Sequence, residues 1–445
     1  MQTFVRTLLA SSALIGATAA ASAADYSPPP AYAPSWTGFY IGGQFGGGAV
    51  VHEVDIPANG PIFNFNGIGG EGFLGGGMAG FNYQIGPKVV IGAQADFSWT
   101  DIESEASLNI GALNANASIR AQWLLGVSGR LGYLLNDNAL LYVIGGYSAA
   151  RFKASAGIAG VGGASLKEDV DGFHIGGGLE GRITDSVTLR AEYRYIQFQE
   201  EEFVGGLIGV EPSMHVGTVG LAWNFGWPGG EAHVSPTADY EPMPEATVAS
   251  WSGLYFGGFI GGGALVHDID IPANGPILEI DGIGGEGILG GPMAGLNYQI
   301  GSFVIGAQFD AAFTGIETEA SLNLAPLLTA SAEVQLDYML SASARVGYLL
   351  NPDTLAYVIG GYTHGHFSAD LNVGGIVALN ASDEKSFAGF HVGGGLEAKL
   401  TDTLTARAEY RYTQFGEEDF FGGLVGVSPS IHTGTVGLAW TFFSL

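Results

Sequence analysis

The stretch GTVGLAWNF, from Gly217 to Phe225, decides the fold, and it returns near the C-terminus as GTVGLAWTF, from Gly434 to Phe442. In both copies, large apolar residues alternate with small or polar ones. This period of two predicts a β-strand. Two aromatic residues end the apolar face, which suits a strand that meets lipid and places its last side chains at the lipid–water boundary. A strand of a soluble sandwich has the same alternation, so the rest of the chain must distinguish the two classes.

The composition excludes several classes of protein. Of the 445 residues, 47% are hydrophobic and 13% are charged, a balance that excludes a disordered chain. The 74 glycines follow no three-residue period, which excludes collagen. There is no cysteine, so disulfides, thiolate metal sites and a lipoprotein anchor are excluded. The formal net charge of −28 argues against nucleic acid as a partner.

The N-terminus has the pattern of an export signal. Arg6 supplies a positive charge, residues 7–20 are apolar or small, and the ASA of Ala21 to Ala23 matches a small-residue cleavage site. We therefore expect a signal peptide over 1–23 and a Pro-rich leader over 24–35. No later run reaches about 18 apolar residues, so we expect no transmembrane helix.

Almost the whole chain is one unit copied twice. WTGFYIGG, which begins at Trp36, returns as WSGLYFGG at Trp251, and IPANGPI at Ile56 returns unchanged at Ile271. The unit is far longer than the 20 to 50 residues of a solenoid repeat. Between the copies, residues 226–250 are rich in Pro, Gly and acidic residues without periodicity, which predicts an extended linker.

Copy one contains eight segments with strand alternation. They are 36–50, 71–85, 88–100, 117–135, 139–153, 169–183, 187–200 and 213–225. The connections between these segments alternate in length. The short ones are Gly86-Pro87, Asn136 to Asn138 and Thr184 to Ser186, and the long ones lie near 51–70, 101–116, 154–168 and 201–212. Short turns on one side and long loops on the other are typical of an antiparallel up-and-down barrel in the outer membrane.

The predicted fold is therefore all-β, with two tandem eight-stranded transmembrane barrels over 36–225 and 251–445. The alternative is one sixteen-stranded barrel around a water channel. In a single barrel the linker would be an unusually long periplasmic turn, and each copy has its own opening and closing strand. The sequence thus favours two barrels.

Charged residues share one face of the predicted strands. In the segment from Val187, the residues Arg190 and Glu192 alternate with apolar ones. A charged side chain that faces lipid at the midplane costs about 2–4 kcal/mol, which predicts an inward orientation. The predicted lumen network is Gln94, Asp96, Arg130, Glu180, Arg182, Arg190, Glu192 and Arg194, with Gln308, Asp310, Arg345, Glu397, Lys399, Arg407, Glu409 and Arg411 in copy two. Interlocking opposite charges would plug an eight-stranded lumen, and the alternative is a gated path for protons or ions.

Three motifs resemble a known family. They are the opening WTGFYIGG, the R-x-E-Y-R-Y of Arg190 to Tyr195 with its repeat at Arg407 to Tyr412, and the closing aromatic strand. Together they resemble the opacity-like, porin-named outer-membrane surface proteins of alphaproteobacteria, relatives of the OmpA-type eight-stranded membrane domain. The resemblance covers both copies. It implies a barrel in the outer membrane, and it brings no single biochemical activity with it.

The resemblance also implies a role for the last strand, which the barrel-assembly machinery reads in such proteins. The residues that would form this signal are Val436, Leu438, Trp440 and Phe442. Here Phe443 to Leu445 extend past the usual terminal aromatic, and the tandem duplication departs from the usual single barrel.

The first hairpin is predicted to stand above the membrane as a β-ribbon. Asn59-Gly60 is a strong two-residue hairpin signal, and the strands beside it extend about 20 residues each, twice the 9 to 11 that cross a bilayer. The second arm carries an apolar stripe at Phe63 and Phe65. Such ribbons offer an edge or a face to another protein. The alternative is that the ribbons pack on one another over the barrel mouth.

The loops give no strong signal for a ligand or a reaction. Acidic pairs such as Glu103 and Glu105 could bind Ca²⁺ or Mg²⁺ and equally suit a solvated surface. His364 and His366 lie on one face of a strand and would need a third ligand to hold a metal. The chain has no nucleophile elbow, HExxH motif or phosphate loop. We therefore predict no metal, no cofactor and no enzyme activity.

The favoured function is that of an outer-membrane surface protein with a structural or interaction role. Its lumen would be plugged by charged side chains, and its external ribbons would be presented for adhesion or assembly. The expected partners are outer-membrane lipid and lipopolysaccharide, the barrel-assembly machinery and a surface protein. The alternative is a porin that forms a passive diffusion channel for small solutes.

Overall fold

The computed structural model describes most of the chain outside the N-terminal segment and the linker. The described residues are 35–57, 61–110, 113–203, 208–226, 250–272, 276–324, 328–375, 379–420 and 425–443. They form β-strands that pair in antiparallel orientation, joined by turns. Within this part of the chain, no helix is long and apolar enough to cross a membrane.

Copy one forms a closed barrel of eight strands, two of which are each divided into two segments. Its strands are β1 (Gly38–Pro57), β2 (Pro61–Ile85), β3 (Val89–Thr100), β4 (Glu103–Ile110), β5 (Leu113–Asn136), β6 (Ala139–Ile158), β7 (Gly162–Arg182), β8 (Val187–Phe198), β9 (Glu201–Phe203) and β10 (Ile208–Gly226). β4 continues the line of β3, and β9 continues that of β8, because each continuation pairs with the same neighbour. The first strand, β1, pairs with both β2 and β10 and so closes the ring.

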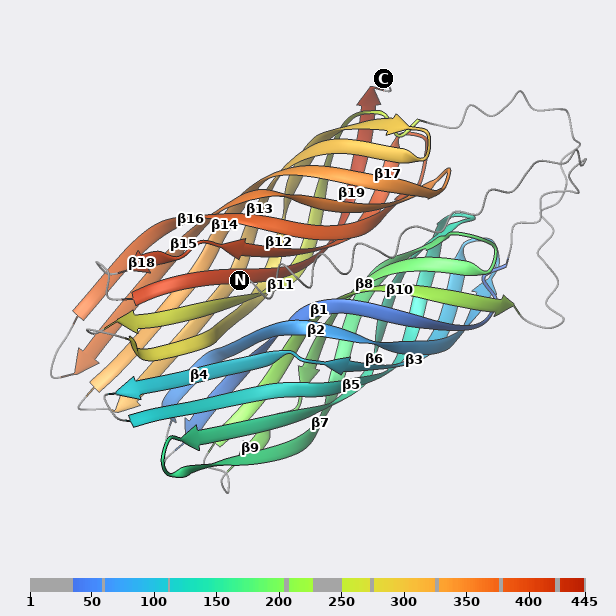
Figure 1. The fold of residues 1–445 in the computed structure, drawn as a ribbon. Helices are drawn as coiled ribbons and strands as arrows, with labels where there is room; N and C mark the ends of the chain where they lie inside the picture. The colour runs from blue at the N-terminus through green and yellow to red at the C-terminus, as the bar shows by residue number, and fades with distance from the viewer. Residues whose placement is uncertain are drawn as a thin grey trace, which may run out of the picture.

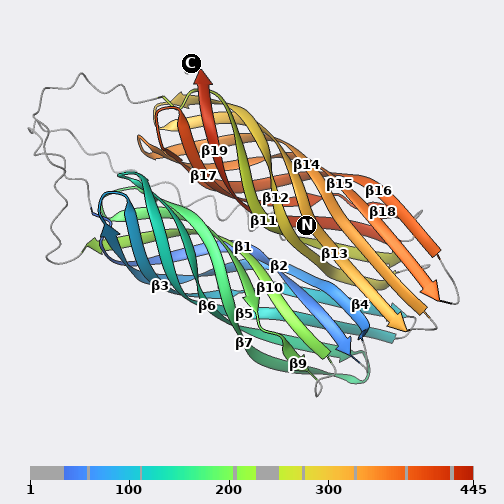
Figure 2. The ribbon, with the colours of Figure 1, turned by 180° about the vertical axis from the view of Figure 1, so that it is seen from behind.

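Copy two repeats this ring. Its strands are β11 (Gly253–Pro272), β12 (Pro276–Ile300), β13 (Phe303–Leu324), β14 (Leu328–Asn351), β15 (Thr354–Gly375), β16 (Leu379–Lys399), β17 (Leu404–Phe415), β18 (Glu418–Phe420) and β19 (Val425–Phe443). β11 pairs with both β12 and β19. The prediction of two tandem eight-stranded barrels is therefore confirmed, and the single sixteen-stranded barrel is wrong. Figures 1 and 2 show the barrels side by side, with their turn ends toward the same side.

The short connections lie where the sequence placed them. β2 and β3 are joined around Gly86, whose φ of 65° lies in the left-handed region that glycine adopts without strain. Gly301, with φ of 62°, makes the equivalent turn in copy two. β5 ends at Asn136, where its side chain accepts a hydrogen bond from the N–H of Asn138 at 2.9 Å. These turns gather at one end of both barrels.

The long connections, in contrast, are mostly strand. The stretches near 51–70, 101–116, 154–168 and 201–212 were expected to be loops, but β1, β2, β4 to β7 and β10 extend through most of them. The prediction of a long first ribbon is confirmed, since β1 has 20 residues and β2 has 25. Its predicted Asn59-Gly60 tip lies outside the described residues.

The strand extensions find partners in the other copy. Residues 63–66 of β2 pair with 319–322 of β13, and residues 278–281 of β12 pair with 105–108 of β4. The first ribbon of each copy thus pairs along one edge with a strand of the other copy. The strands of both barrels therefore belong to one continuous sheet. This satisfies backbone groups that an isolated ribbon edge would expose. The ribbons therefore meet one another at the long end, as the second of the two interpretations expected.

Close strand contact makes one glycine of copy one a test of this packing. A Cβ at Gly76 would overlap the backbone oxygen of Phe97, whereas a Cβ at Gly129 would meet no atom within 4 Å. We expect Gly76→Ala to lower the free energy of unfolding by about 1–3 kcal/mol, because the strands must separate. Gly129→Ala is the control and should leave it unchanged. Urea unfolding in lipid vesicles, followed by tryptophan fluorescence, measures both, and equal effects would contradict the strand spacing.

Candidate functional site

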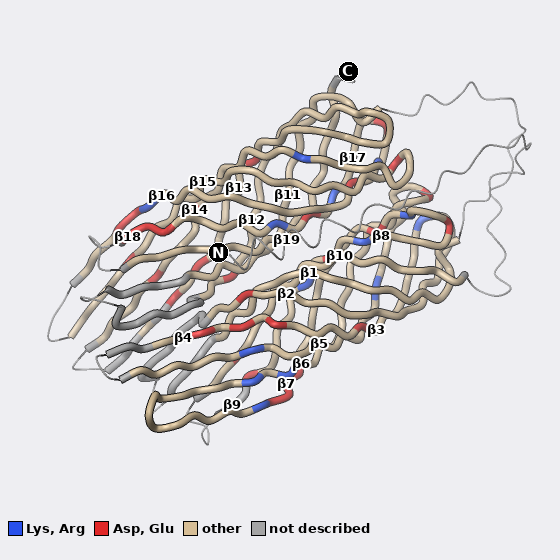
Figure 3. The backbone as a smooth tube through the Cα atoms, in the orientation of Figure 1, with Lys and Arg blue, Asp and Glu red and all other residues tan. Residues whose placement is uncertain are grey.

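The predicted lumen residues lie inside the two barrels. Fifteen of the sixteen are buried, and the side chain of the last, Arg411, is 13% exposed. The residues beside them on the same strands, such as Ile175 and Val346, are exposed and point outward. Figure 3 shows how the basic and acidic residues are distributed along the strands of both barrels. Each barrel thus holds its buried charges on the inner face.

Arg194 of β8 lies at the centre of the network in copy one. Its Nη2 and Nη1 donate to Oδ1 and Oδ2 of Asp96 at 2.9 and 3.1 Å, and its Nε donates to Oε1 of Glu192 at 2.6 Å. The second oxygen of Glu192 accepts a hydrogen bond from Tyr142 Oη at 2.7 Å. One guanidinium therefore pairs with two carboxylates, in the fork geometry that makes such bonds strong.

Arg130 and Arg190 form the rest of the network. Arg130 Nη2 donates to Glu180 Oε2 at 2.7 Å, and its guanidinium lies 4.0 Å from the ring centre of Tyr142. Arg190 Nη1 donates to Gln94 Oε1 at 2.7 Å. The same oxygen accepts a hydrogen bond from Tyr40 Oη at 2.8 Å. The predicted residues of β3, β5, β7 and β8 thus converge from different sides of the ring.

Copy two repeats the arrangement. Arg411 Nη1 and Nη2 each lie 3.0 Å from an oxygen of Asp310, and Arg345 Nη2 lies 2.6 Å from Glu397 Oε2. The neutral residues beside the charges differ in part, since Phe259 takes the place of Gln44, which accepts a hydrogen bond from Arg190 at 3.3 Å in copy one. The charged layer is therefore kept, while its neutral border differs between the copies.

Two predicted members lie apart from these networks. Arg182 Nη1 donates to the backbone oxygen of Asp185 at 2.8 Å, and its guanidinium lies 4.2 Å from the ring centre of Trp36. Lys399 takes the equivalent place, 4.9 Å from the ring centre of Trp251. Both cations lie at the turn end of their barrels, where tryptophan rings offer cation–π contact.

The sequence reasoning missed the neutral partners of the network. These include Tyr40, Tyr142, Thr188 and His174, whose ring nitrogens lie 2.8 and 2.7 Å from the hydroxyls of Ser128 and Ser148. All belong to the inner face by the period of two. That alternation could have identified them, but the predicted lumen set contained only charged side chains and the glutamines Gln94 and Gln308.

Apolar layers lie on both sides of the charged layer. Toward the long end of copy one, Phe152 and Phe198 pack with Leu74, Ile102 and Ile196. Toward the turns, Trp36 packs with Val90, Leu134 and Leu140. Copy two has the same two layers, which are built around Phe367 and Trp251. A cavity of about 30 Å³ lies beside Asp310 and Arg407 in the lumen of copy two, which is the volume of about one water molecule.

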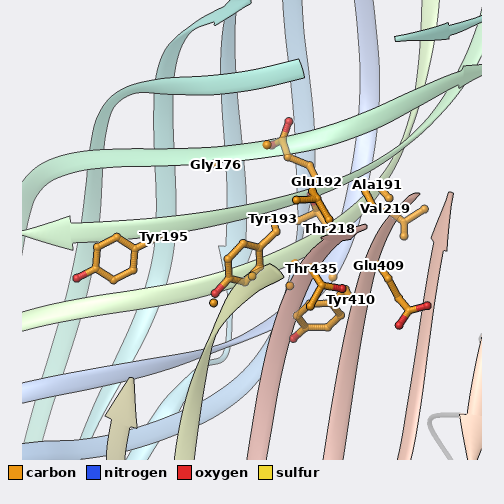
Figure 4. Close-up of a pocket in the computed structure, with 18 of the residues that line it drawn as sticks. Gly176, Ala191, Glu192, Tyr193, Tyr195, Thr218, Val219, Glu409, Tyr410 and Thr435 are labelled. Atoms are coloured by element: carbon orange, nitrogen blue, oxygen red, sulfur yellow. The ribbon is translucent and has the colours of Figure 1, made fainter. Parts of the chain in front are cut away.

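A second cavity lies between the barrels. Its volume is about 1050 Å³, and outward-facing residues of both copies line it, including Phe45, Val219, Val392 and Val436. Figure 4 shows Tyr193 and Tyr410 side by side in this space. The walls are mainly apolar, as expected for surfaces that lie in the hydrocarbon layer.

The structure also places the other residues that the sequence singled out. Val436, Leu438, Trp440 and Phe442 of β19 all point outward, with 44–57% of their surface exposed. His366 contacts Ser386 Oγ at 3.1 Å and Glu384 Oε2 at 3.8 Å. Among the described residues, no group of three or more His, Cys, Asp or Glu side chains is placed to hold a metal ion.

The comparisons with known proteins now identify the family. The model of the outer membrane protein beta-barrel domain matches residues 8–225 and again 242–442. The chain belongs to this family. Both copies are thus members of the outer membrane protein beta-barrel domain family, and the predicted resemblance and outer-membrane location are confirmed.

Two curated relatives of the family come from alphaproteobacteria, as the resemblance implied. The chain is 30% identical over 238 residues to the 31 kDa outer-membrane immunogenic protein of Brucella melitensis, covering 49% of this chain and 98% of that protein. It is 29% identical over 182 residues to a 22 kDa outer membrane protein of Rhizobium leguminosarum, covering 40% and 72%. Each relative therefore corresponds to about half of this double barrel.

Solved structures are more distant. The attachment invasion locus protein Ail of Yersinia pestis aligns with a TM-score of 0.24 and 15% identity, covering 43% of this chain and 99% of Ail. The Pseudomonas putida toluene transporter TodX aligns with a TM-score of 0.24 and 11% identity, covering 91% and 90%. The arrangement of this chain is therefore established by its own strand pairing.

The lumen network predicts a large loss of stability when its central cation is removed. Arg194→Leu leaves the carboxylates of Asp96 and Glu192 buried without their cation, which we expect to cost about 3–5 kcal/mol in the free energy of unfolding. Urea unfolding in lipid vesicles measures this cost. The control is Arg151→Leu, which breaks the surface ion pair between Arg151 and Asp169. The side chains of these two residues are 40% and 55% exposed, respectively. That variant should unfold like the parent, and equal losses in both variants would contradict the role of burial.

Proposed function

We propose that the protein is a non-enzymatic surface protein of the outer membrane whose two barrels are sealed anchors. The observation that carries this proposal is the filling of each lumen, where an ion-paired layer lies between two apolar layers. An ion that crossed such a lumen would have to displace Phe152 and Phe198 and then compete with bonds such as Arg194 to Asp96. In this proposal the barrels hold the external strands in place and carry no solutes.

The external strands then provide the surface for adhesion or assembly. The two first ribbons pair with the other copy, so part of their edges is already occupied. The β6–β7 ribbon of copy one ends in an exposed turn, where Val161 is 82% exposed. Ile158 and Leu166 beside the tip are also exposed and apolar. An exposed ribbon with an apolar tip suits contact with another surface protein.

Lipid is the second class of partner in this proposal. The cavity between the barrels has apolar walls and opens among residues that face the hydrocarbon layer, such as Ile175 and Val219. Acyl chains of outer-membrane lipid or lipopolysaccharide match this environment, because they lose no hydrogen bonds on entering it. The last strand, β19, remains the expected contact of the barrel-assembly machinery during insertion.

The sealed-barrel proposal predicts electrical silence. Purified full-length protein in planar lipid bilayers should give no steady conductance steps, because both lumens are filled at three levels. The same preparation must show the heat-dependent shift in gel migration of a folded barrel, so that silence does not reflect unfolded protein. Large, steady steps would overturn the proposal and favour the porin alternative.

A further inference from the structure

One outward face of each barrel meets the other barrel and not lipid. Tyr193 and Tyr195 alternate along β8 with the inward-facing charges, so they lie on its outward side. In the structure, the ring of Tyr193 lies on Gly434 of copy two, where a Cβ would overlap the ring. The ring of Tyr410 lies on Gly217 of copy one in the same way. Each barrel thus inserts a tyrosine into a glycine notch of the other. Figure 4 shows the two tyrosines, Tyr193 and Tyr410.

A carboxylate lies beside each notch and takes its hydrogen bonds from the opposite barrel. Glu286 belongs to β12 of copy two and accepts from Ser213 Oγ of copy one at 2.5 Å. Its oxygens also lie 3.0 Å from Tyr195 Oη and 3.0 Å from His215 Nε2, again in copy one. Three polar groups of one barrel therefore surround the outward-facing carboxylate of the other.

The same contact occurs a second time with the copies exchanged. Glu71 belongs to β2 of copy one and accepts from Ser430 Oγ of copy two at 2.7 Å. Its oxygens lie 3.2 Å from Tyr412 Oη and 3.1 Å from His432 Nε2. The interface is therefore isologous, since one patch of copy one meets the equivalent patch of copy two.

The histidines connect the two parts of this patch. His215 Nδ1 lies 2.5 Å from Tyr193 Oη, and its Nε2 faces Glu286. A neutral ring that is protonated on Nε2 satisfies both contacts, with Tyr193 as the donor and Glu286 as the acceptor. Tyr410, His432 and Glu71 form the same relay in the other direction. Without the other barrel, each carboxylate would lose three partners and point out of the wall.

Small and apolar residues form further contacts between the barrels. Ala49 and Val51 of β1 pack with Ala264 and Val266 of β11. A Cβ at Gly69 would come within 2.9 Å of the Cα of Gly284, so the chains approach closely there. Near the turns, Leu179 and Ala191 of copy one cluster with Leu396 and Ala408 of copy two. The contact therefore continues along most of the barrel wall.

The internal duplication keeps both halves of the polar contact. The residues of the notch and of the carboxylate site are identical in the two copies, as shown by the pairs Glu71 and Glu286, Tyr193 and Tyr410, His215 and His432, and Gly217 and Gly434. Exposed positions outside it are of both kinds, since Phe39 and Ile41 become Leu254 and Phe256 while Val143 is kept as Val358. An isologous contact requires both halves of the patch on each copy, and a lipid-facing position requires only that the side chain be apolar.

We infer that this patch is a self-complementary docking surface whose partner is a second copy of the same barrel. The full-length chain is then a covalently linked pseudo-dimer. Copy one carries both the acceptor, Glu71, and its matching donors, Tyr195, Ser213 and His215. An isolated copy one therefore has everything needed to pair with itself.

The first test uses the full chain with a specific protease site inserted within residues 227–249. After cleavage in mild detergent, the two halves should stay together and elute with the mass of the uncut protein. Combining Glu71→Ala and Glu286→Ala with Gly217→Leu and Gly434→Leu should increase the separated fraction about tenfold or more, because buried polar anchors and both notches are lost. The new side chains would meet the opposite tyrosine, so each barrel should still fold.

The control variant combines Gly145→Leu and Gly360→Leu, which are equivalent outward-facing glycines of β6 and β15. Their nearest neighbours are backbone atoms of their own barrel, at 3.4 and 3.3 Å. We expect these halves to stay together. If the parent halves separate once the linker is cut, or if the control separates as readily as the interface variant, the inference is wrong.

The second test asks whether copy one pairs with itself. Residues 35–226 form a ring closed by their own first and last strands, so this fragment should fold alone. Analytical ultracentrifugation in density-matched detergent should find a dimer, and Glu71→Ala should shift it toward monomer. A folded fragment that stays monomeric at all concentrations would refute self-complementarity, whatever the conductance measurements show.

Discussion

Each wall of this molecule is one β-strand thick, so every side chain points either into a lumen or out of the barrel. A charge therefore has only two places to go. Arg194 goes inward, where it pairs with Asp96 across the ring and with Glu192 of its own strand. Glu71 goes outward and is stable only because copy two supplies its hydrogen bonds. The closed lumens and the contact between the barrels both follow from this single constraint.

The sequence predicted the inner face well because its signal is local. Alternation along one strand places Arg190 and Glu192 on the same side, and the cost of charge in lipid makes that side the lumen. It could not predict what the outer face meets. Tyr193 and Val219 are both outward and apolar enough for lipid, but one lies on Gly434 and the other lines a cavity. Alternation along a strand tells which residues point inward and which point outward. It contains no information about whether an outward residue contacts lipid or another protein surface.

The same limit explains why the strand pairing along the long connections was not predicted. Residues 63–66 were expected to form a ribbon arm and do pair with 53–56 of their own hairpin, but their other edge pairs with 319–322 of the other copy. Pairing over such a distance leaves no local pattern apart from alternation, and the glycines in these stretches weaken that pattern. The short turns could be predicted because their determinants are local. Gly86 adopts a left-handed backbone conformation, and the side chain of Asn136 accepts a hydrogen bond from a residue two positions later.

The two kinds of buried polar contact differ in how freely they can change. A lumen pair lies within one copy, so the two lumens can diverge independently, and Phe259 in the place of Gln44 shows that they have. A residue of the isologous face contacts a different residue of the other copy, and its own equivalent makes the reciprocal contact. A change at Glu71 breaks one of the two relays and leaves Ser430 and His432 without their acceptor. The second relay, at Glu286, then remains as a polar anchor between the barrels beside the strand pairing and the apolar contacts, so a change on one copy is felt by a residue of the other.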